Sequence, residues 1–152
     1  MGDKGFTILE LLVTIAIVAT LSGLVMYAIV VYINTGKDAS VRGNMVILIP
    51  SGEVYYNVNT IEKETYRGFC ESNVIKEVWK EIPRSSANMS CPPAGNPIIP
   101  GICCGVSELG NAWAACAMLF TDSDKAFCVD STGHKKDIEK GQCTGGITTC
   151  GN

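Results

Sequence analysis

The 152-residue sequence lacks the features that mark a nucleic-acid-binding protein or a common enzyme. Its formal net charge is −3, so no overall positive field exists to hold a phosphate backbone. His134 is the single histidine. There is no phosphate-binding glycine loop, no Gly-x-Ser-x-Gly elbow and no His-Glu-x-x-His motif. We therefore expect no catalytic residue, no cofactor and no direct binding of DNA.

Cysteine is absent from the first 69 residues, and all eight cysteines follow in the rest of the chain. They make up about one residue in ten of their stretch, a density typical of a disulfide-stapled domain outside the cytoplasm. Zinc is the competing use of so many thiols, but no Cys-x2-Cys pair occurs and only one imidazole is available. The sequence therefore predicts disulfides and no metal site. The predicted disulfide cysteines are Cys70, Cys91, Cys103, Cys104, Cys116, Cys128, Cys143 and Cys150.

Charged residues are missing between Glu10 and Lys37, and residues 6–33 are mostly apolar. As a helix, this segment would run about 42 Å, which exceeds the ~30 Å hydrocarbon core of a bilayer. A secretory signal peptide has a shorter apolar core and a small-x-small cleavage site, and neither fits here. A plain signal anchor remains compatible with the length. The segment is therefore predicted to span a membrane as a helix.

Apolar residues at helical spacing continue beyond the apolar segment. This pattern predicts that the helix leaves the membrane with one face packed on a globular domain. Pro50 removes a backbone donor and Gly52 raises the entropic cost of helix formation. A kink or a break is therefore expected near residues 46–50. The apolar residues in question are Val41, Met45, Leu48 and Tyr55.

A β-hairpin is predicted in the second half of the chain. Residues 112–120 and 125–130 are apolar runs that flank the polar turn 121–124. If the two strands register around that turn, Cys116 and Cys128 lie opposite one another, close enough for a cross-strand disulfide. We therefore predict a Cys116–Cys128 bridge.

The rest of the cysteine-containing half of the chain gives weaker signals of secondary structure. Residues 72–81 are predicted to form a short helix, and the Pro-rich and Gly-rich stretch 91–101 is predicted to be a loop. The Gly/Thr-rich tail 141–152 suggests a small stapled loop rather than a strand. Connectivity cannot be derived from spacing, since eight cysteines allow about 105 pairings. For the six cysteines other than Cys116 and Cys128, our hypothesis pairs Cys143 with Cys150. It pairs Cys70 and Cys91 with the adjacent Cys103 and Cys104.

The remaining conspicuous side chains are interpreted as structural. Trp79 and Trp113 are predicted to lie in the core rather than on a carbohydrate-binding surface. His134 is predicted to be an ordinary exposed residue of a solvated polar loop that also holds Lys135, Lys136 and Lys140. Three aspartates could offer oxygen ligands to calcium, but their spacing is not that of an EF-hand, and no metal site is predicted. They are Asp122, Asp124 and Asp130.

The junction Gly5-Phe6-Thr7-Ile8-Leu9-Glu10, directly ahead of the apolar residues 11–21, resembles the type III signal sequence of prepilins. In that family a short charged leader ends in Gly, then Phe follows, with a Glu four residues further on and an unbroken hydrophobic helix. The resemblance implies cleavage between Gly5 and Phe6 by prepilin peptidase. It also implies N-methylation of Phe6 as the new N-terminal residue.

Glu10 is the strongest candidate for a functional residue in the sequence. A carboxylate inside a membrane segment costs about 3 kcal/mol and needs a partner. The resemblance implies that this partner is the Phe6 amine of an adjacent subunit, so that Glu10 and the neighbouring Thr7 serve subunit assembly. The motif Thr7-x-x-Glu10 also fits a capping box at the start of a helix. Both roles can hold together.

The fold expected from residues and resemblance is α+β and pilin-like. A long N-terminal helix would pack its outer half on a small antiparallel sheet with disulfide-rich loops. Residues 1–5 would be a cleaved leader, residues 6–33 a transmembrane and assembly helix, and residues 34–152 an extracytoplasmic head.

The function expected from the resemblance is that of a structural subunit of a type IV pilus-like filament, serving adhesion, motility, DNA uptake or secretion. Its partners would be further copies of itself, alone or with other pilins, prepilin peptidase, an inner-membrane assembly platform and, before assembly, membrane lipid. The N-terminus would lie in the cytoplasm, and the filament would be extracellular or periplasmic. A type II secretion pseudopilin or minor pilin is the alternative within the family. A membrane-anchored binding module that never polymerises is the alternative outside it.

Overall fold

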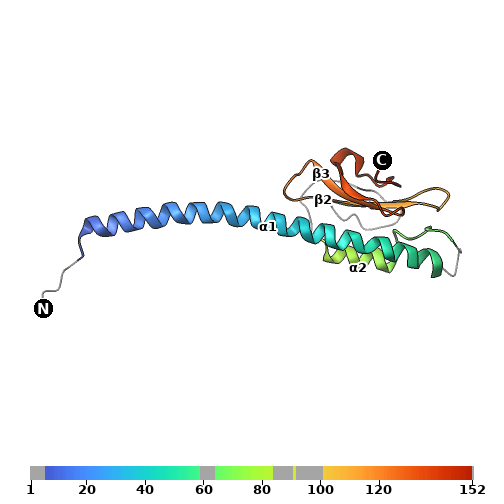
Figure 1. Ribbon diagram of the computed structural model, residues 1–152, viewed down its shortest axis with the longest axis horizontal. Coiled ribbons are helices and arrows are strands. Elements are labelled where there is room, and N and C mark those ends of the chain that lie inside the picture. The colour runs from blue at the N-terminus through green and yellow to red at the C-terminus, as the bar shows by residue number, and fades with distance from the viewer. Residues whose placement is uncertain (1–5, 59–63, 84–90, 92–100, 152) are drawn as a thin grey trace. The chain divides into compact units, whose positions relative to one another are not determined.

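The computed structural model of the protein describes residues 6–58, 64–83, 91 and 101–151 (Figure 1). Its fold is α+β and pilin-like, as predicted. The chain forms two compact units, Met1–Asn34 and Thr35–Asn152. The elements are α1 (Ile8–Val58), α2 (Asn73–Glu81), β1 (Ile102–Val106), β2 (Trp113–Met118), β3 (Lys125–Asp130), β4 (Lys135–Glu139) and the 3-10 helix η1 (Lys140–Gln142).

Helix α1 buries one face within the second unit. Val41, Met45 and Leu48 are fully buried there, and Gly52 follows on the same face. Their spacing of three or four residues places them one above the other on a helix. The predicted apolar face is therefore confirmed for these three side chains, while Tyr55 is half-buried at its edge.

Of the kink or break expected near residues 46–50, the break is wrong, because α1 continues through Pro50 to Val58. A proline inside a helix costs about 3 kcal/mol. Buried residues on both sides of Pro50, Leu48 and Gly52, supply contacts that offset this cost. Gly52 is no helix breaker here: a Cβ atom at this position would lie 2.7 Å from Nε1 of Trp113. The glycine allows the indole to approach the helix backbone.

The sheet is an antiparallel meander in the order β1-β2-β3-β4. The predicted hairpin is present as β2 and β3, and Cys116 and Cys128 are partners in its register. The expected polar loop around Lys135 and Lys136 is wrong, because these residues begin the edge strand β4. Only Ile138 of β4 is buried, so the strand has too few apolar residues to be recognised by composition.

Strand alternation divides the buried side chains of the head into two clusters, one on each face of the sheet. One face packs on α1 and α2, which lie together beneath the sheet in Figure 1. The other face is covered by the C-terminal segment, drawn in red. Trp113 joins the helix-facing cluster and is fully buried, and Trp79 of α2 is 6% exposed. The prediction that both tryptophans belong to the core is confirmed.

Helix α2 has the short span predicted for it and begins at a capping residue. The hydroxyl oxygen of Ser72 accepts a hydrogen bond from the backbone N–H of Ile75 at 3.4 Å. Serine at this position satisfies a donor that the first helical turn leaves unpaired. Ile75 and Trp79, four residues apart, then bury the same face of the helix.

Asp38 of α1 is a buried carboxylate that no sequence pattern singled out. It accepts hydrogen bonds from the backbone N–H groups of Phe120, at 2.5 Å, and Thr121, at 3.1 Å, and from the Thr121 hydroxyl. These donors follow β2 directly. The contacts therefore fix the end of the β2 strand to the helix.

Candidate assembly site

The N-terminal site begins at Phe6, the first described residue. Its side chain is 75% exposed, and α1 starts two residues later at Ile8. Gly5, the predicted processing residue on the other side of the scissile bond, lies outside the described residues. Phe6 thus lies two residues before the start of α1, with its side chain uncovered.

Thr7 and Glu10 form the capping box that their spacing predicted. Glu10 Oε2 accepts the backbone N–H and the hydroxyl of Thr7, each at 2.9 Å. The Thr7 hydroxyl oxygen in turn accepts the backbone N–H of Glu10 at 3.2 Å. This reciprocal pattern satisfies donors that the first turn cannot pair internally. The structure therefore brings these two predicted site residues together and fixes the carboxylate at the start of the helix.

Three threonine and serine hydroxyl groups of the apolar segment are turned back onto the helix backbone. Thr14 donates to the carbonyl of Leu11, Thr20 to that of Ile17 and Ser22 to that of Val18, at 2.8 to 2.9 Å. A hydroxyl left without a partner in hydrocarbon would be costly. These bonds make the three residues compatible with a lipid or helix-packed environment.

Every side chain from residue 6 to residue 33 is exposed in the isolated chain. By length and composition, α1 contains a stretch able to cross a membrane. Six residues at heptad-like spacing line a shallow apolar groove along this stretch. They are Val18, Leu21, Ser22, Val25, Met26 and Ile29. The segment thus has an uncovered apolar surface but no internal contacts of its own to bury it.

The eight cysteines form four disulfides, and none is free. Cys70 bonds Cys104 and Cys91 bonds Cys103, as expected for these four. The predicted pairs Cys116–Cys128 and Cys143–Cys150 are wrong. The structure instead joins Cys116 to Cys143 and Cys128 to Cys150. The tail beyond η1 has no strand among its described residues, as predicted, but it is stapled to the sheet rather than to itself.

The tail explains why the expected pairs do not form. Cys116 and Cys128 do lie opposite one another, on the face of the sheet away from the helices. The C-terminal segment crosses that same face, and the backbone oxygen of Ile147 would lie 2.2 Å from a Cβ atom on Gly105 of β1. This close approach brings Cys143 and Cys150 over the strands, so each strand cysteine meets a tail cysteine.

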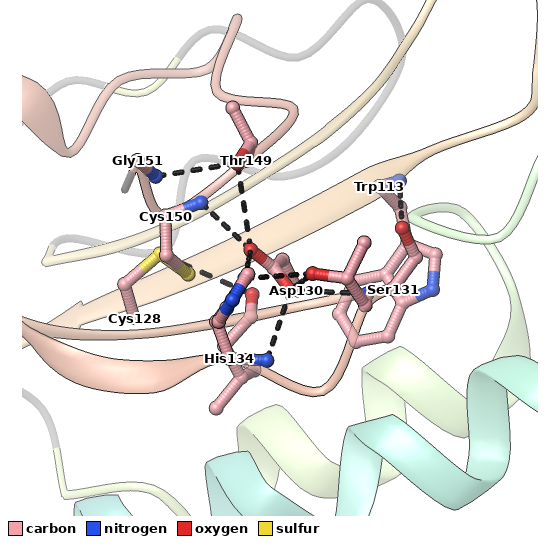
Figure 2. A network of polar contacts seen from close by, with 10 residues as sticks. Trp113, Cys128, Asp130, Ser131, His134, Thr149, Cys150 and Gly151 are labelled. Atoms are coloured by element: carbon pink, nitrogen blue, oxygen red, sulfur yellow. Dashed lines mark hydrogen bonds and ion pairs between the residues drawn. A yellow bond between two sulfur atoms is a disulfide. The ribbon is translucent and has the colours of Figure 1, made fainter.

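Asp130, at the end of β3, is the centre of a polar network that also fixes the tail (Figure 2). Its side chain is 1% exposed. Oδ1 accepts the backbone N–H groups of Thr132 and His134 and the Thr132 hydroxyl, and Oδ2 accepts the backbone N–H of Cys150 at 3.0 Å. Burial opposes the charged form, but these hydrogen bonds together outweigh it and lower the pKa of Asp130.

The structure also shows where His134 lies and whether the three aspartates considered as calcium ligands come together. His134 lies in the β3–β4 turn with a half-exposed ring, and its Nδ1 lies 3.3 Å from Asp130 Oδ2. Asp122 accepts the backbone N–H of Asp124. These two residues precede β3 while Asp130 ends it, a separation of roughly 20 Å along an extended strand. The three aspartates do not converge, so a calcium site built from them is excluded by the geometry.

Sequence reasoning missed the structural roles of Asp38 and Asp130. For Asp130 a signal was present: an aspartate that ends a strand ahead of Ser-Thr-Gly favours a turn in which the carboxylate accepts nearby backbone N–H groups. For Asp38 the sequence offers no such signal, since its partners lie 82 and 83 residues away.

Comparison with known protein families identifies the N-terminal region. Residues 1–26 match the family model described as a prokaryotic N-terminal methylation motif, which is the type IV prepilin signal. Comparison with curated proteins and with solved structures gives no match. The motif and the apolar N-terminal helix fit a secreted subunit of the pilin or pseudopilin type that is anchored in a membrane before assembly.

This match supports placing the chain in a type IV pilin-like family, of the pilin or pseudopilin type. Proteins of this type are structural rather than catalytic. The motif implies processing by prepilin peptidase and assembly into filaments.

Proposed function

We propose that the chain is a structural subunit of a type IV pilus-like filament, polymerised through α1 after removal of residues 1–5. In this proposal residues 6–33 anchor the precursor in the inner membrane with the N-terminus in the cytoplasm. Residues 34–152 form the head outside the cytoplasm. The observation that carries the proposal is the Thr7–Glu10 capping box at the start of an apolar helix whose residues 6–33 are all exposed.

The hydrogen bonds of Glu10 support its proposed role in assembly. Both hydrogen bonds from Thr7 end on Oε2, and among the described residues Oε1 has no partner. The carboxylate is therefore held in place while one oxygen remains available to an incoming cation. Pairing with the Phe6 amine of an adjacent subunit would neutralise both charges as they enter a low-dielectric helix bundle, where the attraction is strong.

The remainder of the helix would supply the packing surface. Once residues 6–33 leave lipid, the apolar groove from Val18 to Ile29 can receive side chains of neighbouring helices. Ser22 in that groove has its hydroxyl bonded to the backbone, and Gly23 has no atom within 4 Å of an added Cβ. Small side chains at these positions permit close approach between helices.

The processing step is tested by intact mass and N-terminal sequencing of the protein from its native membrane. We expect a chain that begins at Phe6 and is about one methyl group heavier than the unmodified sequence. A chain that still begins at Met1 in cells with active prepilin peptidase would contradict the proposal. It would favour a membrane-anchored binding module instead.

The assembly step is tested with two variants that separate charge from capping. Glu10→Gln keeps a side-chain oxygen for the Thr7 donors but removes the charge, whereas Thr7→Ala keeps the charge and removes the side-chain half of the cap. We expect Glu10→Gln to abolish sheared filaments while membrane insertion is unchanged, and Thr7→Ala to retain most of them. If both variants lose filaments equally, assembly requires the cap as well as the charge. If neither does, Glu10 has no role in assembly.

The same preparations address the alternative within the family. A major pilin is expected to be the predominant protein of the sheared filament. A minor pilin or type II secretion pseudopilin would be a trace component, or would remain with the envelope. Either result keeps the assembly chemistry and changes the kind of filament.

A further inference from the structure

Most disulfides of the head do not join cysteines that follow one another in the sequence. Three of the four bridges enclose at least one other cysteine. Cys70–Cys104 spans two, and Cys116–Cys143 and Cys128–Cys150 are interleaved. Cysteines that oxidise with their nearest neighbour in sequence would give none of these three bridges. Correct pairing therefore requires that local partners be avoided or undone.

A specific competing bridge is set up by the sheet. Cys116 and Cys128 are register partners on the β2–β3 hairpin. Residues in register on antiparallel strands have Cα atoms about 4.5 to 5.5 Å apart, within the range for a disulfide. The two cysteines are twelve residues apart, whereas the native bridges join residues 27 and 22 apart. Loop closure alone favours the shorter loop by about threefold over the 27-residue one.

Cys103 extends this arrangement into a row. It is the register partner of Cys116 on β1, so Cys103, Cys116 and Cys128 lie side by side across three strands on one face. The sulfur atoms of Cys103, Cys116 and Cys143 lie within 4.8 Å of one another. A thiolate on any of these residues would have a second disulfide within reach. The row is therefore a place where wrong pairs form easily.

Burial limits when such errors can be corrected. Cys103, Cys116 and Cys128 are at most 1% exposed once the tail covers them, and Cys143 and Cys150 are at most 5% exposed. An external thiol cannot reach these sulfur atoms in the folded head. Exchange must take place while the C-terminal tail is still off the sheet.

We propose that the head is a substrate of a thiol–disulfide isomerase, which resolves a Cys116–Cys128 bridge before the tail docks. The isomerase thiolate attacks Cys116 Sγ, which gives a mixed disulfide and releases Cys128 as a thiolate. Cys143 thiolate then attacks Cys116 Sγ, forms the native bridge and releases the isomerase thiolate, so no electrons are gained or lost. A dithiol-oxidising partner then removes two electrons from Cys128 and Cys150 to form the second bridge.

The test uses the full chain in detergent, reduced and unfolded, then refolded with a chemical disulfide oxidant with and without a purified dithiol isomerase. Alkylation at set times and trypsin digestion distinguish the pairings. Cys70–Cys104 links peptide 68–76, released after Arg67 and Lys76, to peptide 85–125, and this link is not counted below. The other native bridges join three peptides, 85–125, 126–135 and 141–152. A Cys116–Cys128 bridge joins only the first two and leaves peptide 141–152, with Cys143 and Cys150, unlinked to them. Cleavage after Arg84, Lys125, Lys135 and Lys140 produces these fragments.

We expect the two-peptide species to exceed the native one by about threefold early in refolding without isomerase, as loop closure implies. Isomerase should convert it to the three-peptide species. Native pairing at the same rate and yield in both reactions would overturn the proposal. The readout is independent of filament formation, so its failure would leave the proposed function untouched.

Two variants keep the test decisive. Cys143→Ser with Cys150→Ser leaves Cys116 and Cys128 without native partners, and we expect them to bond to each other. If both remain free thiols, the competing bridge does not form and the proposal fails. Cys70→Ser with Cys104→Ser removes a bridge in the helix-facing cluster. This matched control should leave the isomerase dependence of the other two bridges intact, and loss of that dependence would also contradict the proposal.

Discussion

The two units of the chain differ in whether their apolar side chains are buried within the unit. From residue 6 to residue 33 every side chain is exposed and no cysteine occurs. From residue 35 onward, two buried clusters and four disulfides hold the head together. The head is complete by itself, whereas the helix presents apolar surface that only lipid or other protein can cover. The first unit therefore offers the apolar surface that the proposed anchoring and assembly require, and the contacts that stabilise the fold lie in the second.

The largest effect on the stability of the head is expected from removing a core side chain that packs its sheet against its helix. Trp113 is fully buried and packs on Phe69 and against Gly52. Trp113→Ala should lower the free energy of unfolding of the head by about 3 to 5 kcal/mol. Denaturant unfolding followed by circular dichroism measures this.

The control for Trp113→Ala is an exposed apolar residue of the same unit. Leu109 is 78% exposed, so Leu109→Ala should change the free energy of unfolding by no more than about 0.5 kcal/mol. Membrane insertion should be unchanged in both variants, because residues 6–33 are intact. Equal destabilisation by the two substitutions would contradict the assigned core.

A matched pair of glycines tests the close approach in α1. A Cβ at Gly52 would lie 2.7 to 2.9 Å from the Trp113 ring, whereas none at Gly43 would meet an atom within 4 Å. Gly52→Ala should therefore destabilise the head by about 1 to 3 kcal/mol through overpacking. Gly43→Ala should stabilise it by about 0.5 to 1 kcal/mol through helix propensity. Thermal unfolding of both variants in parallel gives the signs, and like signs would refute the packing.

The buried carboxylate predicts how the head responds to acid. Because hydrogen bonds lower the pKa of Asp130 below its usual value near 4, this residue stabilises the fold fully at neutral pH. That contribution is lost as the pH falls below about 4 and through the native pKa. Asp130→Asn should cost about 1 to 3 kcal/mol at pH 7 by mispairing the N–H donors.

Stability curves from pH 7 to pH 2.5 separate the charge of Asp130 from its packing. The variant should lose less stability than the wild type across the acidic part of the range. Parallel curves for the two proteins would show that the carboxylate is not the group that titrates.

The smallest effect is expected from the ion pair between Arg42 of α1 and Asp137 of β4. Its two hydrogen bonds are 2.6 and 2.9 Å long, and the pair lowers the pKa of Asp137 while raising that of Arg42. Both side chains are more than a third exposed, so Arg42→Met should cost no more than about 1 kcal/mol. The loss should shrink in high salt, and a salt-independent loss would point to the contact of the Arg42 guanidinium with the Phe127 ring.

Some of the fold could be predicted because its signal is local. The helix over residues 6–33, the short α2 and the β2–β3 hairpin each follow from periodicity or from a turn between apolar runs. Strand β4 could not be predicted, because four of its five residues are charged and it is recognisable only as the partner of β3. The same holds for Gly52, whose neighbour Trp113 lies 61 residues further along the chain.

The amino-acid sequence by itself determined the membrane-length helix, the Thr7–Glu10 cap and the prepilin signal, since each depends on residues close together in the chain. Only the tertiary structure decided which cysteines meet, how α1 passes Pro50 and what Asp38 and Asp130 bind. Apart from the local contacts of Asp130 with Thr132 and His134, the partners in these cases come from distant segments. Packing of the tail and the sheet, rather than local preference, determines which groups come together.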